Sequence, residues 1–218
     1  MDRRRADGGE TDLVRMAKKI IAINGSYRRG GIIDQAVEAA AAAARAGGAE
    51  TEIVLLSGKN IGFCDNCRAC AQEPGPGRGV CPLGDDMDAI LDAVDACDGL
   101  ILAAPVNCFN VNALFRKFME RGTPYAYWPW GAKGPALRRK AGGKKAVLIT
   151  SSAMPSLLAR FLTGALRALR LTAKSLGARV DGTLFIGISS MEEKPRLSAW
   201  DKRLAEKLGR KLAAGVKR

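Results

Sequence analysis

The chain has 218 residues, of which 47% are hydrophobic, and this suits a single domain with a substantial buried core. Its formal net charge of +13 invites a role in nucleic-acid binding, but the basic stretch between residues 133 and 180 carries no recognition motif. No apolar run is long enough to span a bilayer, and the basic start lacks the apolar core of a signal peptide, so we expect a cytoplasmic protein.

The first elements in chain order are an extension, a strand and a helix. Residues 1–17 mix bases, acids and glycines, and we expect a disordered or loosely packed extension that precedes one folded domain at 18–218. The apolar run 18–24 predicts a strand, and the alanine-rich segment 32–45 predicts a helix. The glycine-rich loop between them would offer backbone N–H groups at a helix start, where an anion can bind.

A second strand is predicted at 51–55, and a loop rich in Gly, Pro and Cys follows at 57–84. This loop holds the spacing Cys64-x2-Cys67-x2-Cys70-x10-Cys81. Disulfides suit small secreted proteins, so in this larger chain we favour a metal or redox use of the thiols. The alternatives are a [4Fe-4S] cluster, a zinc site, and thiols that hold no metal. Close spacing favours iron, because structural zinc more often uses two separated cysteine pairs.

The remaining elements continue the alternation of helices and strands. We predict a helix capped by Asp85 or Asp86, a strand at 99–103, a helix at 112–121, an aromatic loop at 125–130, a strand at 146–150, a helix at 156–176, a strand at 179–188 and a terminal helix from 198. Strands that are apolar on both faces predict an α/β fold, a doubly wound five-stranded parallel sheet with helices on both faces. Ligands in such folds lie beyond the carboxyl ends of the strands.

The aromatic loop at 125–130 has three expected roles. These are alternatives: the loop covers a bound ligand, contributes to a subunit interface, or packs on the surface of its own chain.

Several motifs resemble, in order and spacing, the flavodoxin-like NADPH-dependent FMN reductase family. They are Asn24-Gly25-Ser26, Asp85-Asp86-Met87, Ala104-Pro105-Val106 and Phe118-Met119-Glu120-Arg121. The resemblance covers nearly all of 18–188, and the cysteine spacing resembles the iron-sulfur flavoprotein branch, in which a cluster exchanges electrons with FMN. The chain departs from the family pattern at Tyr27, Ile32, Ile33 and Asn107.

The resemblance implies an FMN-dependent oxidoreductase in which the flavin carries the chemistry and no side chain is catalytic. A chain without histidine lacks the commonest proton shuttle, which agrees with this expectation. The implied cofactor contacts are Ser26, Arg28 and Arg29 at the FMN phosphate, Pro105, Val106, Asn107, Cys108, Phe109 and Asn110 around the ring, and Ser151, Ser152 and Ala153 at its other edge. The implied cluster ligands are Cys64, Cys67, Cys70 and Cys81.

Three functions follow from these motifs. The first is an iron-sulfur flavoprotein that exchanges electrons with a ferredoxin or similar donor. The second is an NAD(P)H-dependent FMN or quinone reductase without a cluster, acting on a small-molecule acceptor. The third is a non-catalytic nucleic-acid-binding module. We expect the first, as a homodimer or homotetramer with no specific nucleic-acid partner and no membrane partner.

Overall fold

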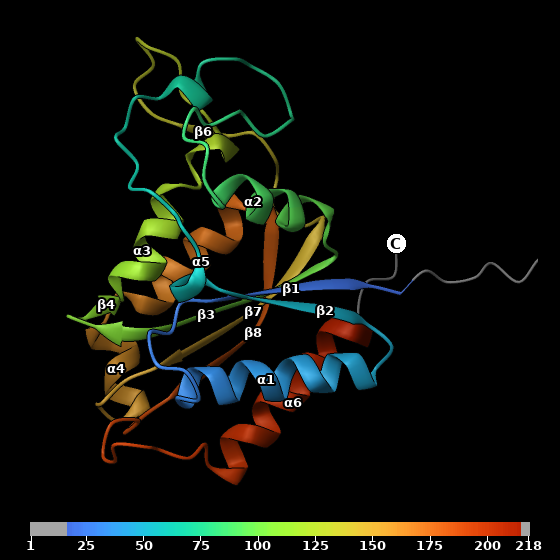
Figure 1. Cartoon of the computed structure of the whole chain (residues 1–218), viewed down its shortest axis with the longest axis vertical. Coiled ribbons are helices and arrows are strands. Elements are labelled where there is room, and N and C mark those ends of the chain that lie inside the picture. Colours follow the sequence, from blue (N-terminus) through green and yellow to red (C-terminus); the bar gives the residue numbers. More distant parts are fainter. Residues whose placement is uncertain (1–16, 215–218) are drawn as a thin grey trace, which may run out of the picture.

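The computed structural model describes residues 17–214, so the predicted extension at 1–17 lies outside the described residues except for its last position. The predicted α/β fold is confirmed (Figure 1). Its sheet has the order β2-β1-β3-β7-β8, all parallel, which is the flavodoxin-like order. The strands are β1 (Lys19–Asn24), β2 (Glu50–Leu55), β3 (Gly99–Asn107), β7 (Lys144–Ser151) and β8 (Ala178–Ile186), and the short β4 (Asn110–Val111) pairs antiparallel with β3.

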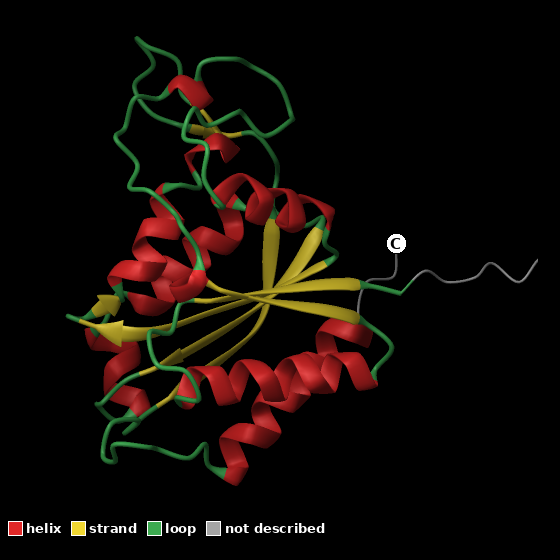
Figure 2. Cartoon of the chain, in the orientation of Figure 1, coloured by secondary structure: helices red, strands yellow, loops and turns green. Residues whose placement is uncertain are grey.

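Helices cover both faces of this sheet (Figure 2). One face carries α1 (Ile32–Ala46) and α6 (Ala199–Ala214), and the other carries α2 (Met87–Ala96), α3 (Ala113–Glu120) and α5 (Ala165–Ser175). The alternation of side chains along β1 explains the two cores. Ile20 and Ala22 pack toward α1, whereas Ile21 and Ile23 pack toward α2, and all four are buried.

The prediction of one helix at 156–176 is wrong. The segment forms two helices, α4 (Ser156–Leu162) and α5. At the break, the backbone N–H of Gly164 donates to the carbonyl oxygen of Phe109 at 2.7 Å, outside any helix. A Cβ on Gly164 would come within 3.0 Å of the Asn110 side chain. The break therefore lets the β3–β4 hairpin pack closely against Gly164, the residue just before α5. The fifth strand also ends earlier than predicted, at Ile186.

The long loop predicted at 57–84 folds together with a second excursion of the chain. It holds only the 3₁₀ turns η1 (Leu56–Gly58) and η2 (Ala69–Ala71), while the second excursion holds η3 (Thr123–Tyr125) and the hairpin of β5 (Ala126–Tyr127) and β6 (Ala136–Leu137). We call residues 59–84 and 123–140 the cysteine lobe, which stands above α2 at the top of Figure 1. Among residues 17–214, no helix combines the length and apolar character needed to cross a membrane.

Candidate functional site

A cavity of about 320 Å³ lies where β1, β3, β7 and β8 end. It is lined by Ser26, Tyr27, Arg28, Gly31, Ile32, Ile33, Pro105, Val106, Asn107, Ser151, Ser152, Ala153, Ser189, Ser190 and Pro195. The structure therefore brings together most of the predicted cofactor contacts from three separate segments, namely the loop after β1, the end of β3, and the end of β7 with the residues that follow it. We call this space the strand-end cavity.

The loop after β1 is organised by its own side chains. The Asn24 Oδ1 atom accepts from the backbone N–H of Ser26 at 2.9 Å, and the Ser26 hydroxyl accepts from the backbone N–H of Arg28 at 3.1 Å. Asp34, in the first turn of α1, accepts from the Asn24 side chain and from the backbone N–H of Gly30, each at 2.8 Å. These bonds fix the loop so that the start of α1 faces the strand-end cavity, the geometry in which a phosphate is bound.

The same loop is pinned to α3. The Asn112 side-chain amide, at the N-cap of α3, donates to the carbonyl oxygen of Gly25 at 2.6 Å. A Cβ on Gly25 would lie 2.9 Å from that of Phe115, so only glycine fits there. The hydroxyl of Tyr27, one of the departures from the family pattern, accepts from the backbone N–H of Leu114 at 3.1 Å. This departure therefore satisfies a donor at the helix start.

The tip of the β3–β4 hairpin lies outside the cavity lining. Cys108 and Phe109 both have positive φ, at 46° and 60°, and form a two-residue turn between the paired Asn107 and Asn110. Both turn residues are exposed, and the Asn110 Oδ1 atom accepts from the backbone N–H of Val111 at 2.8 Å. Cys108, Phe109 and Asn110 thus flank the proposed ring site, and their contact with a cofactor stays a prediction.

Hydroxyl groups gather at the ends of β7 and β8. Ser151 and Ser152 are 5% and 3% exposed, and the Ser152 hydroxyl accepts from the backbone N–H of Met154 at 3.1 Å. The backbone N–H of Ser189 donates to the carbonyl oxygen of Ser152 at 3.0 Å, which joins the two loops. Sequence reasoning missed Ser189, Ser190 and Pro195. The end of the fifth predicted strand was the available signal, because it meets the same edge of the sheet.

A larger hollow of about 980 Å³ lies on the other side of Arg28 and Gly31. Arg29 faces this hollow and a neighbouring one rather than the strand-end cavity. The larger hollow is not at the carboxyl ends of the strands, so we place the cofactor site in the smaller cavity.

The cysteine loop winds tightly between Cys64, Cys67 and Cys70. Asn66 and Arg68, one in each Cys-x2-Cys step, both have φ of 55°. The Arg68 guanidinium lies 3.5 Å from the ring centroid of Trp128 and 4.7 Å from that of Trp130. The aromatic loop therefore packs on the cysteine loop of its own chain and contributes nothing to the lining of the strand-end cavity.

The other three predicted ligand thiols influence the ionisation of Cys70. Burial, followed by the charges of Cys81, Cys64 and Cys67, raises the pKa of Cys70 to about 11. Across residues 17–214, however, no three side chains of Cys, Asp or Glu converge closely enough to hold one metal ion. A four-iron cluster takes one thiolate on each iron, whereas all four ligands of zinc meet at one point. Four cysteines are the donor set that a [4Fe-4S] cluster would take, but no converging group of ligands is present among residues 17–214, so the cluster stays a prediction.

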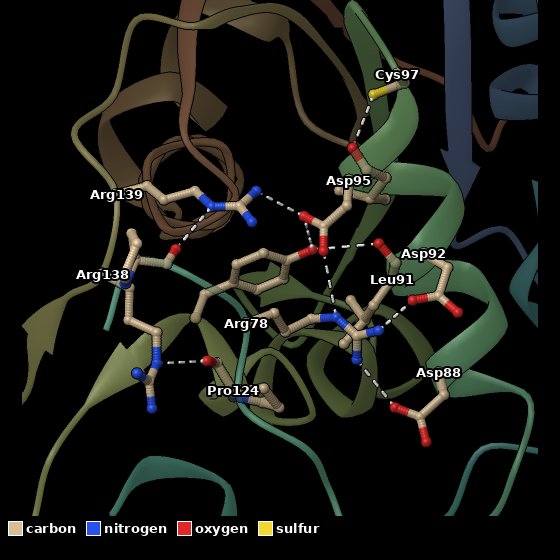
Figure 3. A network of polar contacts seen from close by, with 12 residues as sticks. Arg78, Asp88, Leu91, Asp92, Asp95, Cys97, Pro124, Arg138 and Arg139 are labelled. Atoms are coloured by element: carbon tan, nitrogen blue, oxygen red, sulfur yellow. Dashed lines mark hydrogen bonds and ion pairs between the residues drawn. The ribbon is translucent and has the colours of Figure 1, made fainter. Parts of the chain in front are cut away.

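An ionic network fastens the cysteine lobe to α2 (Figure 3). Arg78 contacts three aspartates on successive turns of α2, Asp88 at 3.0 Å, Asp95 at 3.3 Å, and Asp92. Asp95 also accepts from the Tyr125 hydroxyl at 3.0 Å and pairs with Arg139 at 2.9 Å. Part of the acidic stretch at 85–98 thus neutralises arginines of the lobe.

Comparison with known proteins agrees with these features. The family described as NADPH-dependent FMN reductase matches residues 18–180. A protein named iron-sulfur flavoprotein from Methanocaldococcus jannaschii is 36% identical over 59% of this chain and 61% of its own length. One of the same name from Archaeoglobus fulgidus is 32% identical over 69% of this chain and 63% of its own length. The chain thus spans about three fifths of the length of these curated relatives.

The fold also matches solved structures of low sequence identity. An FMN-dependent NADH-azoreductase from Bacillus anthracis, solved in complex with FMN, superposes with a TM-score of 0.64 at 12% identity. The match covers 91% of this chain and 100% of that one, and at this identity it shows the fold alone.

Proposed function

This chain belongs to the NADPH-dependent FMN reductase family, and we propose that it is an FMN-dependent oxidoreductase of the iron-sulfur flavoprotein kind. One observation carries the proposal: the loop after β1 and the carboxyl ends of β3 and β7, each expected to contact FMN, line one cavity at the edge of the sheet. FMN supplies the electron chemistry when it is bound, so the residues of the chain have only to bind and orient it.

The residues of the strand-end cavity fit this cofactor. Arg28 and the start of α1 offer hydrogen-bond donors and positive charge for a phosphate, and the Ser26 hydroxyl orders the loop that carries them by donating to the carbonyl oxygen of Arg28 at 3.0 Å. The Ser152 hydroxyl already accepts a backbone N–H, so its own hydrogen can point to a ligand atom. Pro105 and Val106 provide apolar surface against a ring, and the buried position of Ser151 excludes water from the ring's edge.

We assign Cys64, Cys67, Cys70 and Cys81 as ligands of a [4Fe-4S] cluster, which exchanges electrons with the flavin. The influence of the other three thiols on the ionisation of Cys70 and the names of the curated relatives support this assignment. Gly79 contributes to the arrangement, because a Cβ there would overlap the carbonyl oxygen of Cys70. The segment before Cys81 can therefore cross directly over the loop that holds the other three cysteines.

The proposed electron donor is a ferredoxin or NAD(P)H, with a small molecule as acceptor. No cysteine of the lobe lines the strand-end cavity, so we also propose a homodimer or homotetramer that brings one chain's lobe to the flavin of another. All six cysteines are free thiols, as a reducing cytoplasm would keep them. Nucleic-acid binding is not proposed, since Arg139 and Lys145 of the basic stretch pair with Asp95 and Asp181.

A reductase without a cluster is the second candidate, and the absence of three converging ligands within residues 17–214 favours it. An absorption spectrum of anaerobically purified protein, before and after dithionite, separates the two, together with iron and sulfide analysis. Flavin bands over a broad, reducible absorbance support the cluster, and flavin bands alone support the second candidate. No chromophore after FMN is added would refute the flavoprotein assignment.

Matched cysteine variants then assign the ligands. Cys70→Ser should lose iron and sulfide and keep FMN. Cys97→Ser should keep both, because Cys97 is buried at the end of α2 with its thiol donating to the Val94 carbonyl oxygen at 3.1 Å. Equal iron content in the two variants would contradict the assignment.

A further inference from the structure

Arg121 is a buried cation at the junction of α3, α2 and the cysteine lobe. It caps the C-terminus of α3, and its side chain is 1% exposed. Its Nη1 atom donates to Asp85 Oδ2 at 2.5 Å and to the carbonyl oxygen of Gly62 at 3.1 Å. Its Nη2 atom donates to Asp85 Oδ1 at 3.0 Å and to Cys81 Sγ at 3.5 Å.

The ion pair with Asp85 compensates the buried charge of Arg121, whose Nε–H has no partner among the described residues. A bidentate arginine–carboxylate pair uses one hydrogen on each terminal nitrogen and leaves the second hydrogen of each to other acceptors. One of these remaining hydrogens reaches the carbonyl oxygen of Gly62, just before the first cysteine of the loop, and the other reaches the sulfur of Cys81. A single guanidinium therefore ties together the two ends of the cysteine loop.

The sulfur contact has a consequence that a purely structural ion pair would not have. A donor from a charged group is stronger than a neutral one, and it favours negative charge on the acceptor. In iron-sulfur proteins, hydrogen bonds to the ligand sulfurs and nearby net charge set the reduction potential. A cation beside Cys81 thus favours the state of the centre that carries one more electron.

We propose that Arg121 is a positioning residue for Cys81, which holds the sulfur in place and favours the reduced state of the cluster through its N–H···S bond. This inference rests on the proposed function, in which Cys81 is a cluster ligand. The step it biases is a one-electron reduction, with the electron supplied by the external donor.

The test compares variants of the full-length protein purified anaerobically. Arg121→Gln with Asp85→Asn removes both members of the pair, so no uncompensated charge stays buried. Arg139→Gln is the matched control, because Arg139 is an arginine of the same lobe that bonds Asp95 and the carbonyl oxygen of Pro76. The readouts are iron and sulfide per FMN and the cluster's reduction potential, from a dithionite titration followed by electron paramagnetic resonance.

The double variant should keep FMN, and at a fixed solution potential its ratio of reduced to oxidised cluster should fall about tenfold. The control should match the wild type. Wild-type potential and iron content in a double variant that still binds FMN would overturn the inference. If the double variant does not fold, Arg121→Lys decides. Its single ammonium cannot reproduce the fork, so a wild-type potential there would also overturn it. A wild-type protein without iron and sulfide would instead refute the proposed function itself.

Discussion

Replacing Arg78 with alanine should loosen the cysteine lobe without unfolding the sheet. Arg78 belongs to the Gly- and Pro-rich segment just before Cys81, and its side chain is 14% exposed. It is the part of this segment that reaches α2, through the contacts with Asp88, Asp92 and Asp95. Its removal should therefore free the segment that carries the fourth cysteine.

The size of the effect follows from the exposure of each partner. The side chain of Asp92 is 69% exposed and that of Asp88 is 36% exposed. Water screens their ion pairs with Arg78, so each pair should stabilise the closed lobe by about 0.5 kcal/mol. Asp95 is 25% exposed, and its pair with Arg78 should contribute about 1 kcal/mol. The sum of about 2 kcal/mol corresponds to a roughly 30-fold larger population of the opened lobe.

Limited proteolysis measures this population when cleavage is slow compared with reclosing. With proteinase K, whose cleavage does not require the arginine that is replaced, the variant should be cut within residues 73–80 about 30 times faster than the wild type, while its thermal unfolding midpoint changes little. Asp92→Asn is the control and should accelerate cleavage less than about threefold. High salt should reduce the difference between Arg78→Ala and the wild type. Equal cleavage rates for all three proteins at low salt would refute the reasoning.

Three further predictions concern the flavin loop, the lobe and the buried ion pair. Ser26→Ala removes a hydroxyl that orders the loop after β1, and FMN titration should show about tenfold weaker binding; unchanged affinity would remove Ser26 from the site. Gly79→Ala should lower the iron content and keep FMN, because the new Cβ would overlap the carbonyl oxygen of Cys70. Gly77→Ala is the control and should change neither, since a Cβ there meets open space. Equal iron content in the two variants would contradict the close approach of Gly79 to Cys70. Burial opposes ionisation of Asp85, but hydrogen bonds from its arginine partner and the backbone lower its pKa to about 2, below the ordinary value of 3.8. The stability it contributes is therefore present above about pH 4 and lost as the pH falls toward 2, and acid unfolding of Asp85→Asn should lack this loss.

The sheet could be predicted because its signal is local. Each strand is an apolar run. In β1 the consecutive residues Ile20 and Ile21 are both buried, on opposite faces of the sheet. The break between α4 and α5 could not be predicted in this way. It depends on a bond from Gly164 to Phe109, a residue far away in the sequence, and helix propensity contains no such information.

The residues of the candidate site also fall into two groups, those that a local sequence signal predicts and those that depend on long-range contacts. Pro105 and Ser151 lie at the carboxyl ends of β3 and β7, where they pair with each other, so the topology alone places them at the cavity. The role of Arg78 is different, because its partners Asp88, Asp92 and Asp95 lie on a separate helix, and nothing in the sequence indicates that this helix contacts Arg78. Only the tertiary arrangement shows that basic and acidic segments neutralise each other.

The two excursions that form the cysteine lobe interlock, and this matters for any attempt to graft the lobe onto a related scaffold. The backbone N–H of Gly79 donates to the carbonyl oxygen of Pro124 at 3.0 Å, and that of Trp128 donates to the carbonyl oxygen of Ala71 at 2.8 Å. Either excursion transplanted alone would leave these groups without partners. Because both begin and end outside the strand ladder, the pair can be exchanged together, and we expect natural relatives to gain or lose the two segments as one unit.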